Sequence, residues 1–400
     1  MPFGTAETFI IDELNELLGR HEVLIVPRSP GKPGLHGTNL IAHTRRETLL
    51  SPRVLGSATS RFVHTPRLVV NSARSVLRTG SLSVALRNLA VLPKALWLAG
   101  LASEWKADHI HCHWAGTTAT MAMVASHLSG VPWSLTAHRS DIVGNNLLRE
   151  KVNRAYVARV ISQDGKRMML GRGVEDKGKL RVLPMGVAIP PAVPFTRSNV
   201  DIVLCPADLL KVKGHRYLLC AWRILKDRGI GGELWLAGEG SLRGVLTKLA
   251  EDLAIADSVR FLGTVAHASL LDLYAKGIIS VVTLASIDLG GGCHEGIPVS
   301  LVEAMSYGIP VIGTNTGGIP ELIKPGTGLL VPACDAGALA SAMQTLLSDH
   351  HLSEQIGRRA RRHIIETRDI TSVAATLAAW FGGECNAPLP AIANEPGSRL

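Results

Sequence analysis

The segment CHEGIPVSLVEAMSYGIPVIG (293–313) holds two glutamates, Glu295 and Glu303, eight positions apart. Pro298 lies between them and suits the first turn of a helix, where its missing N–H costs nothing. The Gly-x-Pro sequence at 308–310 is typical of a helix end. We therefore expect Glu295 in the loop before a helix and Glu303 one to two turns inside it.

The start of this helix is expected to bind an anion. The first N–H groups of a helix, here near 299–302, have no acceptor within it, and the helix dipole favours negative charge. Carboxylates beside an anion site make sense if each accepts hydrogen bonds from hydroxyl groups. The pattern thus fits a ribose and a second sugar on either side of a diphosphate.

Short β-branched segments alternate with segments of helical periodicity along most of the chain. This rhythm predicts parallel sheets covered by helices on both faces, with ligands at the carboxyl ends of the strands. Strands are expected at 21–26, 109–114, 133–138, 158–163 and 179–184, and then at 201–207, 233–238, 258–263, 279–285, 310–314 and 328–332. The proline-rich AIPPAVPF (188–195) separates the two series and predicts a domain boundary.

Length and composition bound the class of protein. With 400 residues, 46% hydrophobic and 19% charged, the chain is long enough for two domains and is not globally disordered. No apolar run approaches the ~20 residues of a membrane span, and no leader pattern opens the sequence, so we expect a cytoplasmic protein. The six cysteines form no CxxC pair, which argues against a disulfide framework and a zinc site.

Positive charge is concentrated in the first half. Residues 1–195 hold 24 Lys and Arg against 13 Asp and Glu, a balance of +11, whereas the remainder is at −2 with 18 against 20. The excess is densest over 45–94, where nine basic residues meet one acidic residue, Glu47. Such a segment attracts phosphate-bearing substrates or an anionic membrane; a solvated helical face is the plain alternative. Nucleic acid fits poorly, because aromatic residues make up 4% of the chain.

The two glutamates sit within EGIPxSLxEAMxxGxPVI, after a KG motif at 213–214 and a GEG motif at 238–240. This arrangement closely resembles the E-x7-E signature of the retaining glycosyltransferases of family 4. The resemblance covers nearly the whole chain, in GTAETFI (4–10), HIHCHWAG (109–116), LTAHRSDI (135–142), KVKGHRYL (211–218), ELWLAGEG (233–240), VRFLG (259–263), 294–323 and LLVP (329–332).

The resemblance implies the GT-B fold, an α/β architecture of two Rossmann-like doubly wound domains facing a cleft. An acceptor-binding domain is expected over 1–190 and a nucleotide-sugar-binding domain over 195–368. A helix at 369–381 is expected to return to the first domain, before a flexible tail at 382–400. Family members open with a central strand, which this chain, starting at MPFG, apparently lacks. Either the true start lies upstream or the sheet is incomplete.

By position, the resemblance implies a donor site made of Lys213, Glu295, Gly296, Ile297, Leu301, Val302 and Glu303. Glu303 would hold the ribose hydroxyls and Glu295 those of the transferred sugar. Amides at 301 and 302 would bind the diphosphate, and Lys213 would neutralise it as it leaves. Asp208 stands where the family has an arginine, and Lys211 is the candidate to replace that charge.

His138 matches the family histidine near the anomeric centre and the acceptor, so the catalytic candidates are His138, Glu295 and Lys213. Asp141 is expected to orient its loop, and Gly4 to let phosphate or acceptor approach closely. The histidines of HIHCH (109–113) share a strand face, as metal ligands can, but no carboxylate lies near them in sequence. We therefore predict no metal site, in keeping with the absence of a D-x-D motif.

The sequence thus predicts a retaining glycosyltransferase that uses a UDP- or GDP-sugar as substrate and needs no cofactor. We expect it to act in polysaccharide or glycoconjugate synthesis on a lipid-linked or other anionic acceptor. Residues 45–94 would contact the inner face of the cytoplasmic membrane. The alternatives are an enzyme for a soluble small molecule and a degenerate, non-catalytic sugar-nucleotide-binding protein, the latter suggested by Asp208 and the missing strand.

Overall fold

The structure of the protein is a computed structural model that describes residues 8–30, 39–191 and 200–384. Internal contacts divide the chain into two compact units. The first unit comprises Met1–Pro184 together with Thr371–Leu400, and the second Met185–Ile370. Each unit has its own parallel sheet, helices on that sheet and a hydrophobic core.

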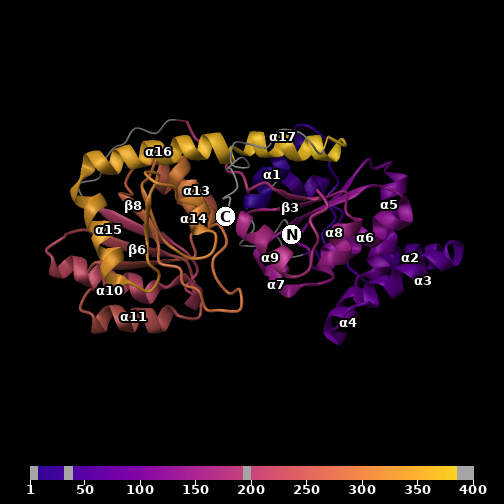
Figure 1. Ribbon diagram of the computed structural model, residues 1–400, viewed down its shortest axis with the longest axis horizontal. Helices are drawn as coiled ribbons and strands as arrows, with labels where there is room; N and C mark the ends of the chain where they lie inside the picture. Colours follow the sequence, from indigo (N-terminus) through magenta and orange to yellow (C-terminus); the bar gives the residue numbers. More distant parts are fainter. Residues whose placement is uncertain (1–7, 31–38, 192–199, 385–400) are drawn as a thin grey trace. The chain divides into compact units, whose positions relative to one another are not determined.

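The first unit contains a four-stranded parallel sheet in the order β1-β2-β3-β4. Its strands are β1 (Ile110–His113), β2 (Trp133–Ala137), β3 (Val157–Val160) and β4 (Leu180–Val182). Its helices are α1 (Thr8–Leu18), η1 (Asn39–His43), α2 (Pro52–His64), α3 (Pro66–Leu77), α4 (Leu82–Ala90), α5 (Leu92–Glu104), α6 (Thr117–Ser129), α7 (Arg139–Gly144), α8 (Leu148–Arg154), α9 (Gln163–Gly171) and α17 (Ile370–Phe381). Figure 1 shows α2, α3 and α4 away from this sheet.

The predicted strand at 21–26 is wrong. The structure has only an isolated bridge there, between Ile25 and Thr44. Pro27 follows at once, and because proline has no N–H it cannot continue a ladder. Gly4, and the start of the chain where the family's first strand is expected to be missing, lie outside the described residues.

The second unit contains a six-stranded parallel sheet in the order β10-β9-β8-β5-β6-β7. Its strands are β5 (Ile202–Pro206), β6 (Glu233–Ala237), β7 (Val259–Gly263), β8 (Val281–Leu284), β9 (Val311–Thr314) and β10 (Leu329–Val331). Its helices are η2 (Lys211–Lys213), α10 (His215–Asp227), α11 (Arg243–Asp252), α12 (His267–Ala275), α13 (Val299–Ser306), α14 (Ile319–Leu322), α15 (Ala336–Ser348) and α16 (His350–Arg368). Figure 1 shows α10 and α11 on one side of this sheet and α13 and α14 on the other. All six predicted strands of this half form.

The predicted site residues follow the carboxyl ends of strands in both units. In the first unit His138 comes directly after β2. In the second unit Lys213 follows β5, and Glu295 follows β8. Because the carboxyl ends of parallel strands meet at one edge of a sheet, each unit presents its own set of candidate side chains at that edge.

No single described helix is long and apolar enough to span a membrane. Helices α4 and α5 together have the length and apolar composition of a membrane span, but they are bent by 41° relative to each other. In the structure α5 is largely buried in the first unit.

Candidate functional site

Lys213 and Glu295, which lie 82 positions apart in the sequence, form an ion pair in the second unit. Lys213 Nζ donates to Glu295 Oε2 at 2.5 Å, and the two side chains are 21% and 15% exposed. This partial exposure leaves both groups within reach of a ligand while shielding them enough to strengthen their attraction. The structure thus brings together the two residues that the sequence assigned to the leaving group and the transferred sugar.

The backbone that carries Lys213 is held close to the loop after β8. Gly214 has φ +65°, and a Cβ on it would lie 1.9 Å from the carbonyl oxygen of Ala285. The Ile287 N–H donates to the Val212 carbonyl at 2.9 Å. The glycine of the KG motif is therefore required by a backbone contact as well as by its positive φ.

The loop that carries Glu295 is held in a similar way from the other side. Gly317 has φ +55°, and a Cβ on it would lie 1.9 Å from the Glu295 carbonyl oxygen. The Gly318 N–H donates to the same carbonyl at 3.3 Å. The TGG sequence at 316–318 thus fixes the backbone of Glu295, with Gly296 and Ile297 directly after it.

Glu303 lies on α13, in its second turn, as the sequence predicted. It is 8% exposed, and its Oε1 lies 2.6 Å from His267 Nε2 at the start of α12. Sequence analysis missed His267, which stands four residues after β7 and offered only its place at the start of a helical segment. Burial, and next the charge of Glu303, raise the pKa of the nearby Tyr274 well above its ordinary value.

The predicted free amides at the start of α13 need a correction. Pro298 is the N-cap of the helix, not a first-turn residue. Its carbonyl accepts the Leu301 N–H at 3.1 Å and the Val302 N–H at 3.3 Å, so these two amides are not free in this structure. The remaining first-turn donors, those of Val299 and Ser300, have no acceptor in a regular helix.

His138 ends β2 in the first unit and is the N-cap of α7. It is 8% exposed, and burial lowers its pKa to about 3, so the imidazole is neutral at pH 7. Asp141 Oδ2 accepts the backbone N–H of His138 at 3.1 Å and that of Ala115 at 3.0 Å. Burial raises the pKa of Asp141 to about 6. This carboxylate joins the loops after β1 and β2.

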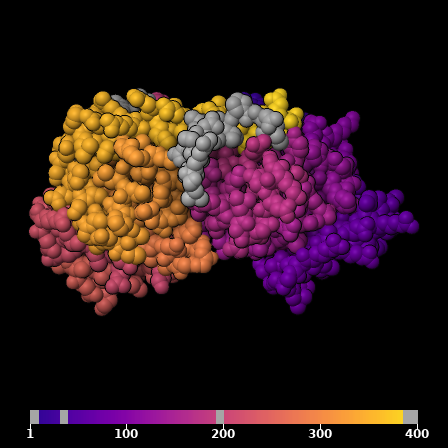
Figure 2. Space-filling model, viewed as in Figure 1, coloured from indigo at the N-terminus to yellow at the C-terminus, as the bar shows by residue number. Residues whose placement is uncertain are grey.

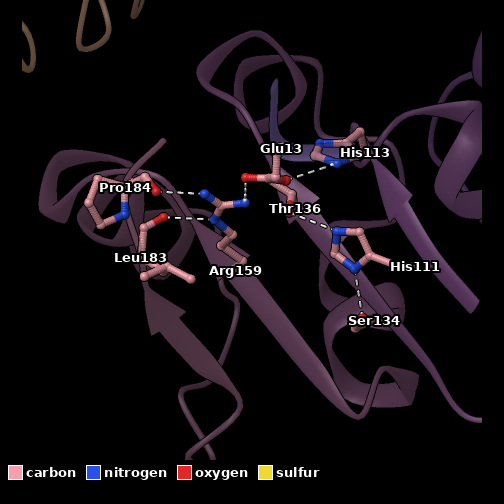
Figure 3. A network of polar contacts seen from close by, with 8 residues as sticks. All are labelled: Glu13, His111, His113, Ser134, Thr136, Arg159, Leu183 and Pro184. Atoms are coloured by element: carbon pink, nitrogen blue, oxygen red, sulfur yellow. Dashed lines mark hydrogen bonds and ion pairs between the residues drawn. The ribbon is translucent and has the colours of Figure 1, made fainter. Parts of the chain in front are cut away.

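His111 and His113 of β1 take part in a buried polar network (Figure 3), and His109 just before the strand contacts one of its members. Both His109 and His111 bond the hydroxyl of Ser134, at 2.6 and 2.7 Å. His113 Nε2 lies 3.3 Å from Oε1 of Glu13, a fully buried carboxylate on α1 that sequence analysis missed. No cluster of three or more potential metal ligands occurs in the part of the chain that the structure describes.

Arg159 is a third residue that sequence analysis missed. It is 1% exposed, and it donates to Glu13 Oε2 at 2.7 Å, to the Leu183 carbonyl at 2.8 Å and to the Pro184 carbonyl at 2.5 Å. Burial alone would raise the pKa of Glu13, but Arg159 and His113 outweigh it and hold that pKa well below its ordinary value. In the sequence Arg159 is simply a charge within a predicted strand.

The GT-B fold consists of two α/β units, each with a parallel sheet and with ligand-binding residues at the carboxyl edge of that sheet. Both units of this protein have a parallel sheet with candidate site residues at that edge. A solved structure of this class is similar along almost the whole chain: HepE from Anabaena in complex with UDP-glucose, with a TM-score of 0.68 and 20% identity over 96% of this chain and 97% of that one. The protein has the GT-B fold.

The sequence comparisons find similarity to glycosyltransferases. Residues 192–363 match the family model for glycosyl transferases group 1. The chain is 28% identical over 304 residues to a GDP-mannose-dependent alpha-(1-6)-phosphatidylinositol monomannoside mannosyltransferase of Mycobacterium tuberculosis. The aligned region covers 70% of this chain and 77% of that protein. It is 32% identical over 208 residues, half of each chain, to the putative colanic acid biosynthesis glycosyltransferase WcaL of Salmonella typhimurium. The second unit is thus similar to the group 1 glycosyltransferases, and the wider similarity of the chain is also to glycosyltransferases.

Proposed function

We propose that the protein transfers a sugar from a UDP- or GDP-sugar to an acceptor hydroxyl, with retention at the anomeric carbon and without a metal ion. The observation that carries the proposal is the Lys213–Glu295 ion pair, held by two backbone contacts beside the start of α13. Similar proteins support either a uracil or a guanine nucleotide in the donor: HepE is in complex with UDP-glucose, and the mycobacterial relative is GDP-mannose-dependent.

The donor site would work by exchange of partners. In the free protein the ammonium group of Lys213 is neutralised by Glu295. A diphosphate at the start of α13 would compete for Lys213, and Glu295 would then accept hydrogen bonds from hydroxyls of the transferred sugar. Glu303, now bonded to His267, would accept from the ribose.

In the transfer step, the bond from the anomeric carbon to the diphosphate oxygen breaks, and a bond to the acceptor oxygen forms on the same face. A phosphate oxygen of the donor takes the proton of the acceptor hydroxyl. Lys213 and the N-terminus of α13 stabilise the negative charge that develops on the leaving diphosphate, the role that a divalent cation has in other transferases. Neutral His138 would contact a hydroxyl near the anomeric centre.

Donor hydrolysis by the purified protein tests this proposal. UDP-glucose and GDP-mannose are each supplied without acceptor, and release of the nucleoside diphosphate is followed. We expect Glu295→Gln and Lys213→Met to reduce the rate by about 10²- to 10³-fold, the usual loss for one group that stabilises developing charge. Glu251→Gln, an exposed carboxylate on α11, is the matched control. Donor binding without turnover would instead identify a non-catalytic binding protein.

We further propose that the enzyme acts at the inner face of the cytoplasmic membrane, in polysaccharide or glycoconjugate synthesis. The α2–α4 surface carries this proposal; it consists of the exposed apolar residues Leu50, Leu55, Phe62, Val63, Leu68, Val70, Leu77, Leu82 and Leu86, with the arginines at 53, 61, 67, 74, 78 and 87. These nine are half of the eighteen exposed large hydrophobic side chains of the described residues. Figure 2 shows this indigo segment projecting from the first unit.

The apolar and basic residues of the α2–α4 surface match the two components of an anionic bilayer. Leu82 and Val63 are 77% and 68% exposed, which is unfavourable in water and favourable in the acyl region. Each arginine near an anionic leaflet adds roughly 1 kcal/mol of attraction. A solvated helical face explains the arginines but leaves the exposed leucines and Phe62 without a purpose.

Sedimentation with lipid vesicles tests the location. We expect the protein to sediment with vesicles of phosphatidylethanolamine and phosphatidylglycerol, less so at 0.5 M salt, and not with phosphatidylcholine alone. The double variant Leu82→Ser, Leu86→Ser should reduce binding, while Val245→Ser, an equally exposed apolar residue on α11, should not. Equal binding by all three proteins would refute a role for this surface.

A further inference from the structure

Trp114, directly after β1, has an unusual backbone conformation. Its φ of +67° lies in the left-handed region, which bulky side chains rarely adopt. Its N–H donates to the Thr136 carbonyl at 2.9 Å, and its carbonyl accepts the Thr118 hydroxyl at 2.8 Å. Strained residues of this kind persist where the surroundings determine them fully, and they cluster at functional sites.

Two buried charged groups fix the residues after Trp114. Asp141 accepts the Ala115 N–H at 3.0 Å. Lys151 is fully buried, and its Nζ donates to the carbonyls of Ala115 at 2.8 Å, Gly116 at 2.7 Å and Asn146 at 2.7 Å. A buried ammonium group is costly unless it is fully hydrogen-bonded, as it is here. The backbone of the loop is therefore held by buried hydrogen bonds, and it sets the direction in which the side chain of Trp114 leaves the chain.

The indole ring of Trp114 packs against the candidate histidine. Its centroid lies 5.2 Å from that of His138, at an interplanar angle of 31°, and 5.9 Å from that of His113. His113 in turn points toward Glu13, which forms a buried ion pair with Arg159 (Figure 3). The three rings form a supported aromatic cluster where β1 and β2 end.

Core packing does not account for Trp114. Four other tryptophans of the chain, at 97, 133, 222 and 380, are at most 9% exposed, as expected of core residues. Trp114 is only partly buried, although the ring of His138 beside it is buried. An aromatic face held rigidly at a ligand-binding edge and left partly open to solvent is suited to stacking against a ligand.

We propose that Trp114 is the platform on which the pyranose ring of the acceptor stacks, next to His138. The apolar face of a pyranose presents C–H groups, whose positive ends are attracted to the negative face of an aromatic ring. The acceptor is the better candidate of the two sugars, because the carboxylates suited to donor hydroxyls, Glu295 and Glu303, both belong to the second unit. This inference rests on the proposed glycosyl transfer and names the recognition element for its acceptor.

The first test measures binding directly. The protein is labelled with 5-fluorotryptophan, and the ¹⁹F resonance of Trp114 is identified by its loss in Trp114→Phe. Methyl α-D-mannopyranoside and methyl α-D-glucopyranoside are then titrated in the presence of UDP, with the acyclic polyol sorbitol as a control. We expect a saturable shift of the Trp114 signal with a pyranoside, and none with sorbitol. The half-exposed Trp105 provides an internal reference. No shift with either pyranoside, or equal shifts of both tryptophans, would overturn the proposal.

The second test separates acceptor from donor. With either pyranoside as acceptor, Trp114→Ala should raise the acceptor KM by about fivefold, and Trp114→Phe by less, because stacking contributes about 1 kcal/mol. Donor hydrolysis should keep its KM within about twofold in both variants. A raised KM for the donor would place the indole at the donor sugar and refute the assignment. Loss of donor hydrolysis in the unsubstituted protein would refute the glycosyl transfer itself, whereas the ¹⁹F titration would still report on the platform.

Discussion

Substituting Arg159 by methionine removes one partner of a buried ion pair and leaves the other in place. The side chains of Arg159 and Glu13 are 1% and 0% exposed, and they meet at 2.7 Å. The variant also frees the carbonyls of Leu183 and Pro184, which the guanidinium group now satisfies. Breaking such a pair from one side typically costs about 3–5 kcal/mol, because the remaining charge is buried without compensation.

The loss should depend on pH in a definite direction. In the native protein the pKa of Glu13 lies below its ordinary value of 4.5, so this group contributes stability above pH 4.5 that is lost as the pH falls. In Arg159→Met, burial is opposed only by His113 and should raise that pKa above 4.5. Stability is then lost as the pH rises above 4.5. The difference between the two proteins is therefore expected to be largest at pH 7 and to shrink toward pH 4.

Hydrogen exchange followed by mass spectrometry measures the free energy of opening separately for each unit. We expect peptides from β3 to lose about 3–5 kcal/mol at pH 7 in Arg159→Met, and peptides from β5 to be unaffected. Arg149→Met is the matched control, since Arg149 meets Glu175 at a similar 2.6 Å but on the surface, where a pair contributes at most about 1 kcal/mol. A loss below 1 kcal/mol in Arg159→Met, or one that does not change with pH, would refute the reasoning.

Three further predictions concern the proposed site. Lys213→Met should lower kcat for donor hydrolysis far more than Lys211→Met, because Lys213 meets Glu295 whereas Lys211 is exposed; equal losses would contradict the assignment of the leaving-group role. Gly214→Ala should lower the melting temperature more than Gly229→Ala, since both have positive φ but only Gly214 would place a Cβ against a backbone carbonyl, at 1.9 Å; similar shifts would show that φ alone matters. Folding lowers the pKa of His138 from 6.5 to about 3, so the stability that this histidine contributes is present above pH 6.5 and is lost as the pH falls. His138→Gln should therefore flatten the decline in melting temperature between pH 6.5 and pH 4.

Sequence patterns predicted the second unit well because its signals are local. Each of its six strands is a short segment rich in apolar residues, and all six form where expected. The E-x7-E motif placed Glu295 before α13 and Glu303 within it, because a proline and a glycine mark the ends of that helix. The amides at 301 and 302 were wrongly expected to be free, since the sequence does not show that the carbonyl of Pro298 closes the first turn on them.

The first unit was harder to predict because its important contacts join distant segments. Glu13 lies 146 positions from Arg159, and nothing in either local pattern distinguishes this pair from surface charges. His267 was missed for the same reason, since its partner Glu303 lies 36 positions away. Trp114 was visible in HIHCHWAG, but its positive φ accompanies contacts with Thr136 and Thr118 that only the folded chain makes.

The buried charges of the first unit share one arrangement. Lys151, Arg159 and Asp141 each bind backbone groups in loops that follow strands of the sheet, in addition to any charged partner. Burying a charge is costly, and a hydrophobic residue of similar size would often be at least as stabilising. The benefit lies in the fixed shape of those loops, because a charged group with several directed hydrogen bonds allows only one backbone arrangement. The rigidity of the cluster around His138 and Trp114 is therefore a consequence of charges that sequence patterns assign to the surface.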